Sequence, residues 1–265
     1  MSEVTRRVFL ASGPVGVLGV GALGATHGLR LEPDGATVSE SYPITPAERA
    51  QAIVGASHVR LERVKALLSE DAGLARASWD WGFGDWETAI GAASHTGRKD
   101  IIELLVAHGA RPTLFTLATL DEVDAVRAVI EHAPGADALE GPHSISLYDH
   151  ARAGQATRVM EYLESRGLKA PDPFATDRAR GEPYLGTYAW GPGADERFEV
   201  AWFERRSAIT LERAGGVSRM LIHRDGHEFS PAGARHARVR FEVGAGVAER
   251  VVVEWAGSVV VGTRL

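Results

Sequence analysis

Ten histidines give this chain its most evident capacity for chemistry, and the densest group lies near the C-terminus. His223 and His227 flank the turn dipeptide Asp225-Gly226, and Glu228 and His236 follow. Two histidines facing each other across a hairpin could hold a metal ion, because imidazole nitrogens are common metal ligands. Polar residues on the solvent face of a sheet give the same pattern. No helical metal-binding motif is present, so we assign no metal site and no cofactor.

A second polar cluster contains the serine, histidine and acidic side chains that a hydrolytic triad uses. Its members are His143, Ser144, Ser146, Tyr148, Asp149 and His150. A triad is defined by geometry, and the sequence has no Gly-x-Ser-x-Gly elbow to expose a nucleophile. The alternative is a polar helix surface. In a helix, Tyr148 and His150 would not lie on the same face, because they are two residues apart. We assign no catalytic residue.

The segment from residue 79 to residue 86 is the most unusual local sequence. Its large rings are Trp79, Trp81, Phe83 and Trp86. Aromatic anchors on a rigid loop can each contribute about 2 kcal/mol at an interface, so we predict that these four rings bind a partner. The alternative is that they fold back over apolar helices, because large aromatic side chains are mostly buried. Asp80, Asp85 and Glu87 beside them would either favour a basic partner or keep the loop solvated.

The composition excludes several classes of protein. The chain has 265 residues, of which 45% are hydrophobic and 24% charged, the ordinary balance of globular domains. Its formal charge of −6 argues against a broad nucleic-acid-binding face. It has no cysteine, which excludes disulfides, thiolate metal sites and a cysteine nucleophile.

The N-terminus has the layout of a secretory signal. Two arginines precede a stretch without charge that runs from residue 8 to residue 25. The segment Thr5-Arg6-Arg7-Val8-Phe9-Leu10 resembles the twin-arginine export signal in Arg6, Arg7, Phe9 and Leu10. The resemblance implies export in the folded state, to the periplasm or the medium. Glycines and a proline weaken the apolar stretch as a helix, although an uncleaved anchor is the alternative. We predict a signal peptide over residues 1–30, with only transient membrane contact, and a linker over residues 31–44.

Residues 45–168 repeat a helical pattern of one apolar residue followed, three and four positions later, by two more. The pattern begins at Val64, Ile101, Val126 and Val159, with offsets of 37, 25 and 33 residues. This spacing puts each apolar set on one helix face. A shared period near thirty residues suggests stacked helix pairs, which must pack against one another to bury their apolar faces.

The copy from residue 88 to residue 112 resembles the ankyrin repeat. The matching residues are Thr88, Ile90, Ala93, Gly97, Ile101, Leu104, Leu105, Gly109 and Ala110. Ala89 and Gly91 depart from the repeat's usual proline and histidine, which weakens its hydrogen-bonded turn. The resemblance implies an N-terminal α-solenoid of degenerate ankyrin-like helix pairs over residues 45–168.

Beyond a proline-rich linker over residues 169–183, the hydrophobic period changes from helical to alternating. Seven strand candidates follow in residues 184–265, and Asp225-Gly226 signals a hairpin between two of them. We predict a separate antiparallel β-domain, either a small barrel or a sandwich. Its opening, Tyr184-Leu-Gly-Thr-Tyr188, resembles the small β-domain appended to some exported bacterial hydrolases of the serine β-lactamase type. The resemblance brings no catalytic residue.

The sequence therefore predicts an α + β protein of two separate domains that is exported and non-catalytic. Another protein would bind the repeat surface, and no nucleic acid would. One alternative is an extracytoplasmic hydrolase with a site at the domain junction, where ligand sites often occur. Another is a β-barrel that holds a small apolar ligand in a cavity lined by Trp202, Phe241 and Val253.

Overall fold

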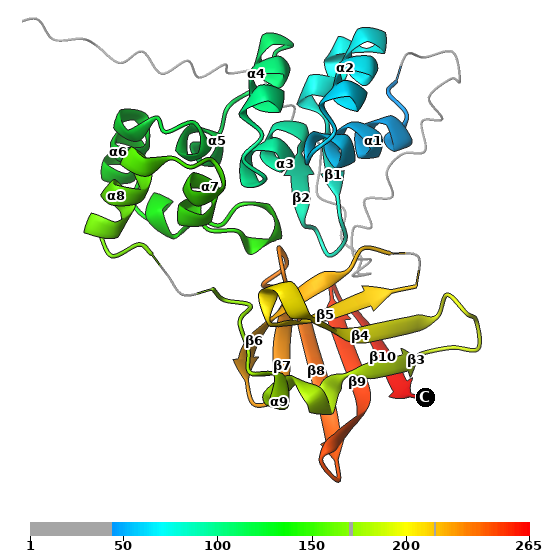
Figure 1. Cartoon of the computed structure of the whole chain (residues 1–265). Coiled ribbons are helices and arrows are strands. Elements are labelled where there is room, and N and C mark those ends of the chain that lie inside the picture. Colours follow the sequence, from blue (N-terminus) through cyan, green and yellow to red (C-terminus); the bar gives the residue numbers. More distant parts are fainter. Residues whose placement is uncertain (1–43, 170–171, 215) are drawn as a thin grey trace, which may run out of the picture. The chain divides into compact units, whose positions relative to one another are not determined.

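The computed structural model describes residues 44–169, 172–214 and 216–265, and residues 45–265 group into one unit (Figure 1). The predicted signal peptide with Arg6, Arg7, Phe9 and Leu10 lies outside the described residues, as do residues 31–43 of the predicted linker. No helix in the described ranges combines the length and the apolar character that crossing a membrane requires.

Short helices occupy the first half of the described chain. They are α1 (Ala47–Ser57), α2 (Leu61–Glu70), α3 (Ala89–His95), α4 (Lys99–Ala107), α5 (Leu114–Thr119), α6 (Val123–His132), α7 (Leu147–Ala153) and α8 (Thr157–Ser165). Each odd-numbered helix packs against the even-numbered one that follows it. Side-chain caps start three of them, because the hydroxyls of Thr88, Thr113 and Ser146 accept backbone N–H groups at the starts of α3, α5 and α7.

The predicted α-solenoid is wrong. The described helices have 4 to 11 residues, and 3₁₀ turns and a two-stranded sheet interrupt them. Their apolar side chains form two clusters, one under α1–α4 and one under α5–α8. Buried hydroxyls meet between α3 and α5, where Ser94 Oγ donates to Thr116 Oγ1 over 3.0 Å. A solenoid buries one continuous core between equivalent repeats, and apolar spacing within each helix does not ensure that equivalence.

The aromatic segment folds as a hairpin. Strand β1 (Ser78–Asp80) pairs antiparallel with β2 (Trp86–Thr88), and Trp79 lies opposite Glu87 in the register. The turn between them contains Gly82 and Gly84, both with positive φ, a conformation that glycine adopts without strain. β2 leads directly into α3, so this hairpin fixes the position of Glu87 relative to the first helices.

The second half of the chain is a closed antiparallel barrel, in agreement with the barrel alternative of the prediction. The short helix α9 (Arg178–Gly181) precedes it. Its strands are β3 (Gly186–Ala189), β4 (Arg197–Phe203), β5 (Ala208–Arg213), β6 (Arg219–Asp225), β7 (Glu228–Pro231), β8 (Arg238–Gly244), β9 (Val247–Trp255) and β10 (Ser258–Arg264). Neighbours in sequence pair, and β10 closes the barrel against β3. Closure removes every sheet edge.

Large side chains fill the barrel. Tyr188, Phe229 and Phe241 are buried in one cluster, and Val253 belongs to the same cluster. Trp202, which was predicted to line an internal cavity with Phe241 and Val253, is only partly buried. A barrel of eight strands is wide enough either for its own side chains to fill its interior or for one small ligand, and Phe198, Leu211 and Val253 line a pocket of about 600 Å³.

Ion pairs and hydrogen bonds connect the helical half to the barrel. Arg219 on β6 forms an ion pair with Asp85, and the two side chains are 5% and 2% exposed. Gly233 N donates to Ser144 Oγ over 2.9 Å, and Arg235 forms a bidentate ion pair with Glu140. These contacts join helical and β segments within residues 45–265. Sequence periodicity cannot reveal them, because they link residues far apart in the chain.

Candidate metal centre

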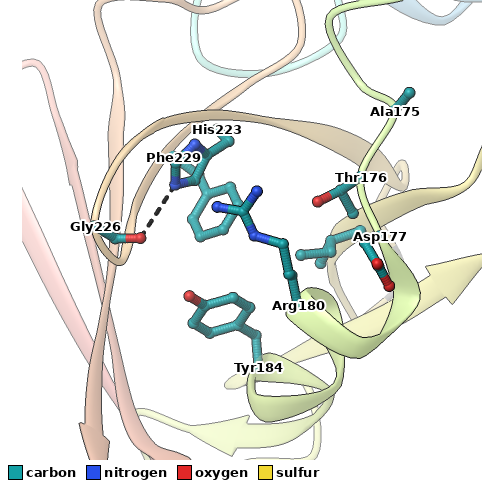
Figure 2. Close-up of a pocket in the computed structure, with 9 residues that line it drawn as sticks. Ala175, Thr176, Asp177, Arg180, Tyr184, His223, Gly226 and Phe229 are labelled. Carbon is teal, nitrogen blue, oxygen red and sulfur yellow. Dashed lines mark hydrogen bonds between the residues drawn. The ribbon is translucent and has the colours of Figure 1, made fainter.

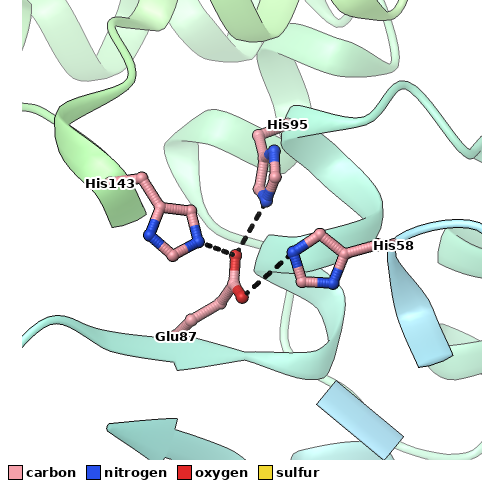
Figure 3. Close-up of side chains that lie close together, drawn as sticks. All are labelled: His58, Glu87, His95 and His143. Atoms are coloured by element: carbon pink, nitrogen blue, oxygen red, sulfur yellow. Dashed lines mark ion pairs between the residues drawn. The ribbon is translucent and has the colours of Figure 1, made fainter. Parts of the chain in front are cut away.

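Three histidines and one glutamate converge in the helical half, and we call this set the metal centre: His58, Glu87, His95 and His143 (Figure 3). His58 follows the last residue of α1, and His95 is the last residue of α3. Glu87 is the middle residue of β2. His143 lies in the 3₁₀ turn Pro142–Ser144, between α6 and α7. Four different elements therefore supply one side chain each.

The Glu87 carboxylate lies among the three imidazole rings, as Figure 3 shows. Its Oε1 is 2.9 Å from His95 Nε2 and 3.5 Å from His143 Nε2. Its Oε2 is 3.4 Å from His58 Nε2. One ligand atom from each residue lies within 4.8 Å of every other. A tetrahedral ion with bonds of about 2.1 Å would separate its ligand atoms by about 3.4 Å, so these distances fit a single ion.

Two atoms of the metal centre lack hydrogen-bond partners. Glu87 Oε1 and His95 Nε2 are both buried, and they lie 2.9 Å apart without meeting hydrogen-bond geometry. A buried polar atom without a partner costs about 1–3 kcal/mol. A cation bound to both atoms would satisfy them, since each has a lone pair to offer.

Neighbouring groups orient the ligand side chains. His58 Nδ1 donates to the Val54 carbonyl oxygen over 3.2 Å, and His143 Nδ1 donates to Asp85 Oδ2 over 2.6 Å. Both bonds leave Nε2 facing the Glu87 carboxylate. Trp81 Nε1 donates to Glu87 Oε2 over 2.7 Å. Metal-binding histidines almost always use their second nitrogen in this way, toward a backbone carbonyl or a carboxylate.

The electrostatics of the metal centre favour a bound cation. Burial opposes ionisation of Glu87, but the close imidazoles of His143 and His95 outweigh it, so the pKa of the Glu87 carboxyl is lowered. Burial also disfavours the charged form of His143, yet its bonds to Asp85 and Glu87 raise its pKa to about 9. Burial lowers the pKa of His58 below 6.5. Without a metal, a protonated His143 is therefore the counter-ion of two carboxylates.

The donor set indicates the class of metal. Imidazole nitrogen suits Zn²⁺, Cu²⁺, Fe²⁺ and Ni²⁺, whereas Mg²⁺ and Ca²⁺ prefer sets composed of oxygen. Structural zinc sites are usually rich in cysteine, while catalytic ones combine histidine with carboxylate. The metal centre has three nitrogens and one carboxylate, so it lacks the thiolates of most structural sites, and water or a substrate would bind a held ion as a fifth ligand.

The structure places the four predicted partner-binding rings differently from one another. Trp79 and Trp81 are half-buried against the core of α1–α4. Phe83 is half-buried against the barrel cluster, with its ring 6.0 Å from that of Trp255. Trp86 is 64% exposed. Three of the four rings therefore have contacts within the chain.

The C-terminal histidines do not converge. His223 Nε2 lies 3.1 Å from the carbonyl oxygen of Gly226, as Figure 2 shows, and His227 Nδ1 bonds the Tyr184 hydroxyl over 2.8 Å. His223 borders a hollow of about 320 Å³ beside α9, which Arg180 and Tyr184 also line. None of these histidines belongs to a metal-compatible group within the described residues.

The polar cluster around residue 146 does not form a triad. Ser146 Oγ accepts the backbone N–H of Asp149 as the N-cap of α7, and it donates to the Asp149 carboxylate over 2.8 Å. His150 is fully buried, and its Nδ1 donates to the Ser146 carbonyl oxygen over 2.8 Å. The serine hydroxyl and the imidazole thus serve the helix start.

Sequence reasoning missed the metal centre because its residues share no local motif. One signal was present: the apolar pattern at Val64 recurs 37 residues later at Ile101, and His58 and His95 are also 37 residues apart. Both histidines end the first helix of a helix pair. No family model matches the sequence, and no curated protein matches it either.

Proposed function

We propose that this chain is a metalloprotein that binds one divalent transition-metal ion, Zn²⁺ or an ion of similar chemistry, at the metal centre. The observation that supports this proposal is the convergence of three imidazole nitrogens on a fully buried carboxylate, with two atoms left without hydrogen bonds. The bound ion would act as a Lewis acid or activate a water molecule.

The first experiment measures metal stoichiometry and affinity in the full-length chain. The protein is stripped with a chelator, titrated with Zn²⁺ by calorimetry and analysed for metal content. We expect one ion per chain. Glu87→Gln should lower the affinity by at least tenfold, because the amide carries no charge and is a weak ligand. The control Glu103→Gln lies on the exposed face of α4 and should bind like the wild type.

A second pair of variants tests the proposal even if Glu87→Gln fails to fold. His58 and His108 both follow the last residue of a helix, and in each the Nδ1 atom bonds a carbonyl four residues earlier. Only His58 belongs to the metal centre. His58→Gln should weaken Zn²⁺ binding and His108→Gln should not. Equal affinity in wild type, Glu87→Gln and His58→Gln would refute the proposal.

We also propose that the protein is exported through its N-terminal arginine pair. Export in the folded state would let the protein load its metal before it leaves the cytoplasm. Replacing Arg6 and Arg7 by lysine together should retain the protein in the cytoplasm, as cell fractionation would show. Unchanged export of that variant would contradict the proposal.

Binding of another protein through the aromatic segment is a narrower proposal, supported by the exposure of Trp86 alone. Trp86→Ala should reduce capture of a partner from an extracytoplasmic extract without changing metal content. Full retention of capture would exclude this surface.

A further inference from the structure

A pocket of about 440 Å³ adjoins the metal centre. His95 and His143 form part of its wall, and their side chains keep 10% and 20% of their surface exposed. Its volume falls within the range of small-molecule sites, about 300–1,000 Å³. The pocket therefore reaches two of the four side chains of the metal centre, while Glu87 and the Nε2 atom of His95 are buried behind its wall.

Apolar side chains make up most of the remaining wall. They are Ile145, Trp202, Phe203, Val217, Met220 and Ala232. Thr210 is 8% exposed, and its hydroxyl donates to the Ala201 carbonyl oxygen. Ser218 is exposed at the rim. A ligand that fills this space gains mainly by removing apolar surface from water.

Arg219, the one arginine or lysine that lines the pocket, is already engaged. It pairs with Asp85, and its guanidinium also donates to the carbonyl oxygens of Ala232 and Gly82. Its side chain is 5% exposed. An anionic ligand in the pocket therefore has the bound metal as its strongest electrophilic partner.

We infer that the pocket takes a small organic acid with an apolar tail, whose carboxylate binds the metal while its tail lies against Ile145, Phe203 and Met220. This inference rests on the proposed metal centre. It names the class of ligand that the metal centre admits: an apolar monocarboxylate, rather than a sugar, a nucleotide or a polyanion.

The experiment uses the full-length chain loaded with Co²⁺, whose visible absorption bands report on the ligands of the ion. Binding of Co²⁺ itself should produce these bands, and Glu87→Gln should diminish them. Hexanoate should then change the bands, and it should do so at concentrations at least tenfold lower than acetate. Each buried methylene strengthens binding by about 0.8 kcal/mol, so even two buried methylenes would give roughly this ratio.

Variants of the pocket wall distinguish binding of the acid's tail in the pocket from binding of the ion at the metal centre. Met220→Gln and Ile145→Ser should bring the hexanoate affinity to within about threefold of the acetate affinity and leave the Co²⁺ bands intact. The control His223→Gln alters the separate hollow beside α9 and should keep the full preference for hexanoate.

The outcomes distinguish the two proposals. If the Co²⁺ bands appear but hexanoate and acetate bind equally well, the metal centre stands and the apolar acid is wrong. If hexanoate is preferred but both wall variants keep that preference, the tail lies elsewhere and the inference is also overturned. If no Co²⁺ bands appear, the metal centre and the inference fall together.

Discussion

Two groups of histidines in this protein have similar compositions and different surroundings. In the helical half, His58, His95 and His143 direct Nε2 atoms at one buried carboxylate. On the barrel, His223 and His227 flank a hairpin turn, and each finds a separate partner, a backbone carbonyl and a tyrosine hydroxyl. The first group comes from distant parts of the chain, whereas the second lies within five residues.

The comparison shows that histidines close in sequence need not converge in space, whereas distant ones can. A hairpin keeps nearby histidines on a solvated surface, where water and backbone groups satisfy them. Elements packed around a core can instead aim several nitrogens at one point and exclude the water that would compete with an ion.

Removing one ligand should have the largest effect. Structural zinc sites with four ligands contribute about 10–16 kcal/mol, so each ligand accounts for about 2.5–4 kcal/mol. His95→Ala should therefore weaken Zn²⁺ binding several-hundredfold in calorimetric titrations. The double variant His223→Ala and His227→Ala should bind Zn²⁺ like the wild type. If the barrel variant lost more Zn²⁺ affinity than His95→Ala, the barrel histidines and not the metal centre would bind the ion.

The buried His150 should make stability depend on pH. Burial lowers the pKa of His150 to about 4, and the ordinary value is 6.5. Above pH 6.5 both the folded and the unfolded forms are neutral. As the pH falls from 6.5 to 4, His150 binds a proton in the unfolded chain but stays neutral in the folded chain. The unfolding free energy therefore falls by about 3 kcal/mol.

Denaturant unfolding at several pH values measures this loss. His150→Leu should reduce the pH dependence between 6.5 and 4 and leave the part that His58 contributes, while the exposed His132→Leu should leave it unchanged. The ring of His150 lies 6.3 Å from that of His95, yet His150 is not part of the metal centre. An equally steep pH dependence in His150→Leu would assign the acid sensitivity to other groups.

Loss of one orienting hydrogen bond should have a moderate effect. Trp81→Phe keeps an aromatic ring against the helical core but removes the N–H that donates to Glu87 Oε2. Groups that support metal ligands typically change affinity by about 10–100-fold, and we expect about tenfold weaker Zn²⁺ binding. Trp79→Phe removes an indole from the same hairpin without removing a bond to Glu87, so its affinity should not change.

A change inside the barrel should affect stability slightly and metal binding not at all. The fully buried Tyr188 donates its hydroxyl to the Tyr184 carbonyl oxygen over 2.7 Å. Tyr188→Phe should lower the unfolding free energy by about 1–3 kcal/mol, because it removes this bond and the one that the hydroxyl accepts from Arg264. Calorimetry should find an unchanged affinity for Zn²⁺. A fall in that affinity would show that the barrel core influences the metal centre.

Much of the secondary structure could be predicted from local patterns. Alternating residues from Arg197 to Phe203 form β4, and the Asp225-Gly226 signal coincides with the turn between β6 and β7. Strand β7 was missed because it has four residues and ends at Pro231, which leaves too little alternation to detect. Apolar spacing identified α2, α4, α6 and α8, but their regular stacking was wrongly inferred from that same spacing.

Local patterns in the sequence are enough to locate several helices and most strands, and its composition excludes thiol chemistry. Hydrophobic periodicity and residue counts establish these points, because they depend on neighbours in the chain. Only the tertiary structure decided that His58, Glu87, His95 and His143 meet, and that Arg219 lies against Asp85. A metal ion requires several atoms at one point in space, and the folding of distant elements alone brings them there.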